Sequence, residues 1–320
     1  MNRLPIRLFL TFFILISLIQ TAKSESIRLA ILKYGTVNWE INVIKHHNLD
    51  KKYGVDLNIT YLTNKIAASI ALMSGDVDII VTDWVWVSRQ REEGEDFTLV
   101  PYSTAAGALM VPIDSDINYL EDLKNHKIGI AGGSIDKSWI LMRAYSMKVL
   151  NFDISKNVDA AYAAPPLINA MVTRKELDGA LNYWNYTARL KALGLKKIIS
   201  ISEILPQLGI GEALPLIGYV FSEKWAKENP LRLKGFLDAS NEARQILKNS
   251  DEEWERIKKI TGSKNLETLV ALRDGFRAGI PDTNTDYTLS IAKAFKILAD
   301  IGGQELVGDS KELSNGVIWR

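Results

Sequence analysis

The sequence predicts an α/β protein with two lobes. Short apolar strands alternate with amphipathic helices after Glu25, the alternation resumes as a second block after residue 112, and the chain beyond Leu216 has helical periodicity. Alternating strands and helices form βαβ units, which build parallel sheets with right-handed crossovers and bind ligands at the carboxyl ends of the strands. We therefore expect two lobes, each a mostly parallel sheet flanked by helices, with the helical tail packed back on the first.

The elements of the first block follow from their apolar patterns. Short apolar or alternating runs indicate strands, and apolar residues at helical spacing indicate helices. We expect strands at residues 26–35, 55–63 and 77–84, helices at 37–54 and 64–76, and a charged helix after Asp83.

The second block repeats the alternation, and the tail is helical. We expect helices at residues 120–126, 134–150 and 167–177 and strands at 127–133, 158–166 and 178–186. Longer helices are expected within 222–248 and 285–302. The sequence has no internal repeat and no low-complexity linker.

Residues 1–24 have the pattern of a secretory signal. Two arginines flank the start of an apolar run from Leu8 to Ile19, and Ala22-Lys23-Ser24 forms a small-x-small cleavage site. The run is shorter than the roughly 20 residues that span a bilayer, and no comparable run follows. We expect a mature protein that begins near Glu25, lies in a bacterial periplasm and has no stable membrane anchor.

Charge and cysteine content exclude several classes of partner. The sequence has 39 Lys and Arg against 38 Asp and Glu, and the signal holds three of the basic residues and no acid, so the mature chain is nearly neutral. No field of one sign is available to gather nucleic acid or anionic lipid. The absence of cysteine excludes disulfides, thiolate metal sites, a cysteine nucleophile and a lipid-modified cysteine anchor.

The sequence also argues against an enzyme, a metal site or a bound cofactor. Its three histidines are His46, His47 and His126, and each lies in a surface-like position at a helix end or before a strand. The G-x-S-x-G elbow and both glycine-rich nucleotide motifs are absent. We expect a binding protein without catalysis, metal or cofactor.

Three stretches in the same order as in a known family resemble the periplasmic substrate-binding proteins of ABC importers. The resemblance is to the branch that includes nitrate, taurine, alkanesulfonate and thiamine-pyrimidine binders, and it covers nearly the whole mature chain. The stretches are ASIALMSGDVDIIVTDW at residues 68–84, YLEDLKNHKIGIAGGS at 119–134 and FSEKWAKENPLRLKGFLDASNEA at 221–243.

The resemblance implies a type II periplasmic binding protein-like fold whose lobes are joined by two crossing segments and close over a ligand. The crossings would lie near GALMVP (107–112) and LPLIGYV (214–220), so residues 25–112 and 217–320 would form lobe one and residues 113–216 lobe two. It further implies a monomer that passes a small solute to an ABC permease and its ATPase.

The corner after the strand at 77–84 carries the first candidate ligand-binding residues, Asp83, Trp84 and Trp86. Asp83 either caps the next helix or offers its carboxylate to the ammonium or hydroxyl group of a ligand, and one oxygen can serve each role. Residues 84 and 86 lie about 200° apart around a helix, so both cannot face the cleft.

The first βα corner resembles the first ligand loop of the family and offers Tyr34, Asn38 and Trp39. The alternative is a glycine-permitted turn with Trp39 in the core. Asn64, beside Thr63, either binds ligand or caps the following helix.

In lobe two, Gly133, Ser134 and Lys137 lie between a strand and a helix. Exposed N–H groups at a helix start bind oxyanions, and Lys137 would add charge. Alternatively, Ser134 caps the helix and Lys137 is solvated.

A second group in lobe two is aromatic. Tyr183, Trp184 and Asn185 lie in one loop, and Trp184 is the best match to a tryptophan that covers the ligand in the resembling proteins. Tyr162 ends the preceding strand and borders the cleft. Structural packing is the alternative for Tyr183.

These residues allow two kinds of ligand. A taurine-like zwitterion would place its sulfonate at Gly133-Ser134 and its amine near Asp83, and a nitrate- or sulfonate-like oxyanion would use the first of these sites. The tryptophans equally suit a thiamine-pyrimidine-like heterocycle or an alkylated amine. In that alternative the protein would serve a sensor or a periplasmic enzyme system.

Overall fold

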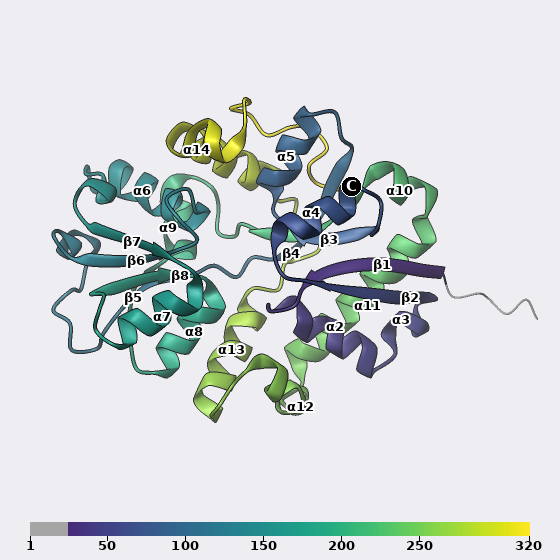
Figure 1. The fold of residues 1–320 in the computed structure, drawn as a ribbon, viewed down its shortest axis with the longest axis horizontal. Helices are drawn as coiled ribbons and strands as arrows, with labels where there is room; N and C mark the ends of the chain where they lie inside the picture. Colours follow the sequence, from purple (N-terminus) through teal and green to yellow (C-terminus); the bar gives the residue numbers. More distant parts are fainter. Residues whose placement is uncertain (1–24) are drawn as a thin grey trace, which may run out of the picture.

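The computed structural model describes residues 25–320 as two α/β lobes, each built around a five-stranded sheet (Figure 1). The expected signal at residues 1–24 lies outside the described residues. The first lobe lies on the right of the view and the second on the left. The predicted two-lobed α/β class is confirmed, although each sheet contains antiparallel pairs.

The first sheet has the strand order β2-β1-β3-β10-β4. Its parallel part is β1 (Glu25–Leu32), β2 (Val55–Leu62) and β3 (Ile79–Thr82), and its antiparallel part is β4 (Phe97–Ser103) and β10 (Ile217–Ser222). The chain enters β10 from the second lobe, and this strand therefore runs opposite to both β3 and β4.

The second sheet has the order β7-β6-β8-β5-β9. Its strands are β5 (Ala108–Val111), β6 (Lys127–Ala131), β7 (Asp159–Ala163), β8 (Gly179–Asn182) and β9 (Lys196–Ser200). β6 is parallel to β7 and β8, and β5 is antiparallel to β8 and β9. The boundary drawn at residue 112 placed residues 108–111 in lobe one, whereas their pairing places them in the second sheet.

Helices follow the strands in both lobes. The first lobe has α2 (Val37–His46), α3 (Leu49–Lys52), α4 (Lys65–Met73) and α5 (Trp84–Glu92). The second has α6 (Lys137–Val149), α7 (Pro165–Thr173), α8 (Trp184–Ala192), α9 (Ile201–Leu208) and the 3₁₀ turns η1 (Leu120–Leu123) and η2 (Ile154–Lys156). After β10 come α10 (Glu223–Glu228), α11 (Pro230–Asn249), α12 (Asp251–Thr261), α13 (Leu266–Ala278) and α14 (Thr288–Val307). Among these helices of residues 25–320, none combines the length and the apolar character that a membrane crossing requires.

The helical tail contacts both lobes. α11 packs on α2 and α3 of the first lobe, as expected, but α13 packs on α8 of the second lobe, and α14 packs on both α5 and α6. Figure 1 shows α14 at the top and α13 near the bottom, each beside the junction of the lobes. Ile291, Phe295 and Leu298 of α14 belong to an apolar cluster that continues from one lobe into the other, which explains why the tail does not stay on the first lobe.

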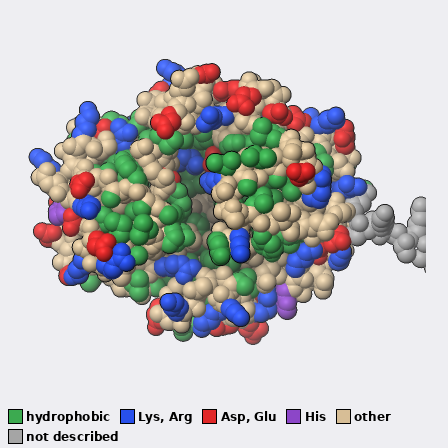
Figure 2. All heavy atoms as spheres, viewed as in Figure 1, with side chains coloured by type: hydrophobic (Ala, Val, Ile, Leu, Met, Phe, Trp, Pro, Cys, Tyr) green, Lys and Arg blue, Asp and Glu red, His purple; other side chains and the backbone are tan. Residues whose placement is uncertain are grey.

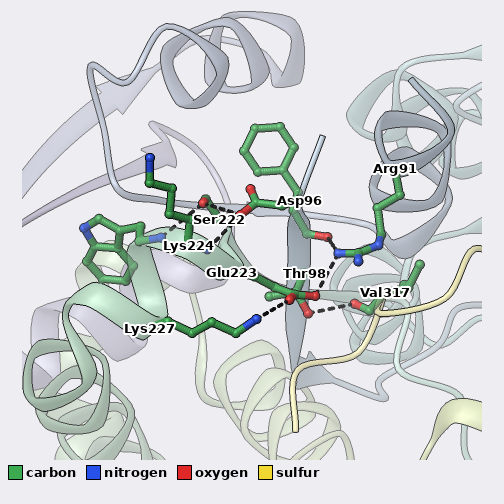
Figure 3. Close-up of polar contacts among 10 residues, drawn as sticks. Arg91, Asp96, Thr98, Ser222, Glu223, Lys224, Lys227 and Val317 are labelled. Atoms are coloured by element: carbon green, nitrogen blue, oxygen red, sulfur yellow. Dashed lines mark hydrogen bonds and ion pairs between the residues drawn. The ribbon is translucent and has the colours of Figure 1, made fainter. Parts of the chain in front are cut away.

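A polar network holds the first sheet together at the end where β4 begins and β10 ends (Figure 3). Asp96 accepts hydrogen bonds from the Ser222 hydroxyl at 3.0 Å and from the Lys224 N–H at 2.7 Å. The Thr98 hydroxyl donates to the carbonyl of Val317 at 3.4 Å, so the last residues of the chain run beside β4. This network fixes the strand ends opposite to those that carry the candidate site.

Candidate functional site

Asp83 lies between β3 and α5, where it caps a helix and also pairs with a lysine of the other lobe. Its Oδ1 accepts the N–H of Trp86 at 3.2 Å and thereby caps α5. Its Oδ2 accepts a hydrogen bond from Nζ of Lys137 at 3.0 Å. Lys137 is the first residue of α6, so this ion pair joins the two lobes at the corners that follow β3 and β6.

The interlobe ion pair is largely shielded from water. Only 12% of the Asp83 side chain and 18% of the Lys137 side chain are exposed. Lys65 lies 3.7 Å from the same carboxylate, but 58% of its side chain is exposed. Burial opposes ionisation of Asp83, yet the charges of Lys137 and Lys65 hold its pKa well below the ordinary value. Burial also opposes the charge of Lys137, but Asp83 and Asp136 raise its pKa overall, so both partners are charged at neutral pH.

Asp136, which the sequence analysis missed, caps α6. Its Oδ1 accepts the N–H groups of Ser138 at 2.9 Å and Trp139 at 3.4 Å. Ser134 is exposed and does not cap the helix. The signal for Asp136 was present in the sequence, because aspartate is among the preferred N-cap residues and Asp136 stands immediately before the first helical residue.

Tyr183 connects the end of β8 to this cap. Its hydroxyl donates to Oδ2 of Asp136 at 3.1 Å. Burial and the adjacent carboxylate raise the pKa of Tyr183 far above its ordinary value, so the hydroxyl keeps its proton. Gly132 lies beneath this contact with φ of +94°, and a Cβ there would lie 2.6 Å from the tyrosine hydroxyl and 3.0 Å from Asp136 Oδ2. Only glycine fits this close approach.

Trp39 and Trp184 form an aromatic contact between the lobes. Their ring centroids lie 5.9 Å apart at 86°, an edge-to-face arrangement. Gly275 of α13 makes room for the Trp184 ring, because a Cβ at this position would lie 2.9 Å from ring atom Cε3. Trp39 also packs on Trp254 and Phe276, so the sequence alternative in which Trp39 belongs to the core is the one observed.

The two tryptophans of α5 serve packing in this arrangement. Trp84 is 0% exposed, and its indole N–H donates to the carbonyl of Pro215 at 2.7 Å. Trp86 is half-buried and stacks on Phe97 with a centroid distance of 5.4 Å. Both rings therefore make packing contacts within the fold, whereas sequence reasoning allowed one of them at the cleft.

The remaining candidates either make local hydrogen bonds or are open to solvent to different degrees. Asn38 donates from its amide to the carbonyls of Leu32 at 2.9 Å and Gly35 at 3.0 Å, so it braces the first loop. Asn64 caps α4 by accepting the N–H of Ala67 at 2.9 Å. Tyr34 and Tyr162 are exposed, and Gly133 and Asn185 are half-buried.

The surface between the lobes is hollowed, and Lys or Arg side chains lie on the wall of the hollow (Figure 2). A cavity of about 350 Å³ lies elsewhere, between α6, α9 and α14, and another of about 270 Å³ lies between α12 and α13. No group of three His, Cys, Asp or Glu side chains suited to a metal ion occurs within residues 25–320. The chemistry of the corner is therefore that of opposite charges and hydroxyl groups.

A family model described as NMT1/THI5 like matches residues 42–253, which is more than half of the 320 residues and includes Asp83, Asp136 and Lys137. The chain belongs to this family. No curated protein matches the NMT1/THI5-like chain.

Solved structures share the fold of this NMT1/THI5-like chain. The periplasmic aliphatic sulphonate binding protein SsuA from Escherichia coli superposes with a TM-score of 0.74 at 17% identity, covering 92% of each chain. The alkanesulfonate-binding protein SsuA from Xanthomonas axonopodis pv. citri, bound to MOPS, gives 0.65 at 16% identity over 92% of this chain and 98% of its own. An ABC transporter protein from Parabacteroides distasonis gives 0.69 at 12% identity, covering 92% and 99%. The resemblance stated from the sequence is confirmed.

Proposed function

We propose that this NMT1/THI5-like chain is a periplasmic solute-binding protein that closes its lobes over a small organic solute and delivers it to an ABC permease with its ATPase. The Asp83–Lys137 pair carries the proposal. Two oppositely charged, shielded side chains from separate lobes meet at strand-end corners, where α/β folds bind ligands. The fold shared with sulfonate-binding proteins supports it.

When the lobes close over a solute, Asp83 and Lys137 would exchange their contacts with water for contacts with the solute. When the lobes separate, water hydrates Asp83 and Lys137 independently. A zwitterion such as a taurine-like aminosulfonate gives each side chain an opposite charge, with its ammonium on Asp83 and its acidic group on Lys137. Because a shielded charge is costly without a partner, a solute with both charges lets the lobes close around it.

The wider assignment follows from the same picture. Residues 25 to about 104 with 217–320 would form lobe one, and the residues between them lobe two. We assign the exported protein to the periplasm as a monomer that releases its solute chemically unchanged. A bound solute that is recovered as a different compound would contradict this assignment.

A thermal-shift screen of the protein from Glu25 onward tests the proposal. The probes are taurine, ethanesulfonate, nitrate, choline and an aminopyrimidine, each with wild type and with Asp83→Asn. A solute at 100 times its dissociation constant adds about 2.7 kcal/mol of stability, which is visible as a higher melting temperature. We expect stabilisation of wild type by taurine or choline and its loss in Asp83→Asn. Failure of every probe, or an unchanged shift in Asp83→Asn, would contradict the proposal.

The Trp184 ring favours a second candidate ligand class. It is half-buried at the contact between the lobes, and a flat heterocycle or an alkylated amine could be held on its open part by stacking or cation–π contact. Such a protein would serve a sensor or a periplasmic enzyme system. A melting-temperature rise with the aminopyrimidine that Trp184→Phe preserves and Trp184→Ala abolishes would favour this candidate. A neighbouring kinase or oxidoreductase gene would favour it further, whereas permease and ATPase genes favour import.

A further inference from the structure

The N-terminus of α6 already holds an anion, which is the carboxylate of Asp136. Its Oδ1 accepts two backbone N–H groups, at 2.9 Å and 3.4 Å, and its Oδ2 accepts the Tyr183 hydroxyl at 3.1 Å. These donors are the kind that would otherwise bind the oxyanion of a solute. The N–H groups at the start of α6 are therefore bound from within the chain, one turn beyond Gly133-Ser134, where the sequence analysis placed an oxyanion.

The fold holds this carboxylate in place. The bare backbone of Gly132 allows Asp136 and Tyr183 to approach each other over the turn, since a Cβ at Gly132 would lie 2.6 Å from the Tyr183 hydroxyl. Ser138 and Trp139, whose N–H groups bind the carboxylate, are 5% and 2% exposed. An outside anion would have to displace a carboxylate with three hydrogen bonds.

The charges around the corner also disfavour an anion. Asp83 and Asp136 both act on the charge of Lys137, and burial leaves little water to screen them. Lys65 contributes less, because 58% of its side chain is exposed. Asp83 and Asp136 thus share one shielded ammonium, that of Lys137, because water screens the charge of the exposed Lys65, and an added positive group would be favoured beside the two carboxylates.

We propose that Asp136 is a specificity-determining residue: it occupies the anion-binding end of α6, so the cleft rejects solutes whose only charged group is an oxyanion and selects solutes that carry a cationic group. This inference rests on the proposed solute-binding function and narrows its ligand class. Taurine-like zwitterions and alkylated amines satisfy it, whereas nitrate, sulfate and plain alkanesulfonates do not. Specificity here comes from a repulsive element as well as an attractive one.

Isothermal titration with ethanesulfonate, taurine and choline tests the inference, because ethanesulfonate is taurine without its amine. The variants are Asp136→Ala, which frees the two N–H groups, and Asp136→Asn, which removes the charge but keeps a capping acceptor. Ser250→Ala is the matched control. It removes the N-cap of α12, in which the Ser250 hydroxyl accepts the N–H of Glu253. Circular dichroism confirms that each variant is folded.

We expect wild type and Ser250→Ala to bind ethanesulfonate at least about tenfold more weakly than taurine or choline. Asp136→Ala should bind ethanesulfonate more tightly than wild type does, by about tenfold or more. This gain corresponds to one additional charge-assisted hydrogen bond. Asp136→Asn should show a smaller gain. Folded Asp136 variants without any gain, or wild type with ethanesulfonate as its tightest ligand, would overturn the inference. If the proposed function fails, no probe binds wild type. Tighter binding of ethanesulfonate by Asp136→Ala than by wild type would then still show that Asp136 excludes oxyanions.

Discussion

Glu40 is a fully buried carboxylate whose two oxygens have unequal environments. Oε1 accepts the hydroxyls of Tyr219 at 2.7 Å and Ser240 at 2.6 Å. Oε2 lies 3.5 Å from Nε of Arg244, and within residues 25–320 neither Oε2 nor the hydroxyl of Tyr102 has a hydrogen-bond partner. Burial raises the pKa of Glu40 above its ordinary value of 4.5 in spite of the Arg244 charge. Glu40 therefore makes the stability of the first lobe depend on pH.

Because the folded protein raises this pKa, the stabilising contribution of protonated Glu40 is complete below pH 4.5 and is lost as the pH rises through the folded-state pKa. We expect Glu40→Gln to remove this dependence. The difference in the free energy of unfolding, variant minus wild type, should rise by at most about 1.4 kcal/mol per pH unit. Urea unfolding from pH 4.5 upward measures it, and parallel curves would contradict the prediction. Glu242→Gln is the control, since its partners lower the pKa of Glu242 and its effect should be smaller and opposite.

At the scale of elements, α8 of the second lobe packs closely on α13. The ring of Trp184, at the start of α8, packs against Gly275. Arg189, further along α8, donates a hydrogen bond to the carbonyl of Thr261 at 2.6 Å. Ala188 of α8 is buried in the apolar cluster of the first lobe. A helix of the second sheet thus completes the core of the first lobe.

Gly275→Ala should test this contact. The new Cβ would lie 2.9 Å from the Trp184 ring, which is closer than side chains tolerate. Overpacking costs about 1–3 kcal/mol, and the better helix propensity of alanine returns about 0.5–1 kcal/mol, so the net effect on unfolding should be destabilising. In a Trp184→Phe background the same change should be neutral or stabilising. Equal destabilisation in both backgrounds, measured by thermal unfolding, would show that the Trp184 ring is not what Gly275 accommodates.

At the scale of the whole molecule, contacts of three kinds join the lobes within residues 25–320, apart from the Trp39–Trp184 contact. The Asp83–Lys137 pair lies at the strand-end corners, α8 packs on α13, and α14 packs on both α5 and α6. The ion pair differs from the other two contacts because separation of the lobes would return its charges to water. Closure should therefore be the movement most sensitive to these two side chains.

Loss of the ion pair should favour separated lobes. Breaking a buried pair from one side costs about 3–5 kcal/mol, whereas removing both charges costs less than the sum of the single changes. We expect Asp83→Asn to give a larger radius of gyration in small-angle scattering, and Asp83→Asn with Lys137→Met to be more stable than the single effects predict. Lys175→Met, which removes an exposed ion pair of the second lobe, is the control. Additive stabilities and an unchanged radius would contradict a linking role for the pair.

The sequence alone predicts the elements whose pattern is local. It predicts β1 to β3 and β6 to β8, because apolar strands there alternate with amphipathic helices. The helix expected over residues 37–54 divides into α2 and α3 because Asn48 adopts the left-handed region, with φ of +52°. It did not predict β4 and β9, whose antiparallel partners come from distant parts of the chain, and the region of β5 was expected only as a crossing between the lobes.

The candidate site divides in the same way. The sequence by itself determined the fold class, the strand-end corners and the charged side chains Asp83 and Lys137, because strand and helix patterns and residue chemistry are local properties. Only the tertiary structure decided that these two, 54 residues apart, pair across the lobes, that Asp136 fills the end of α6, and that Trp184 seats on Gly275. Such contacts depend on how two sheets and two bridging helices pack together. A pattern within a short stretch of chain does not encode the distance between residues that lie far apart in the sequence.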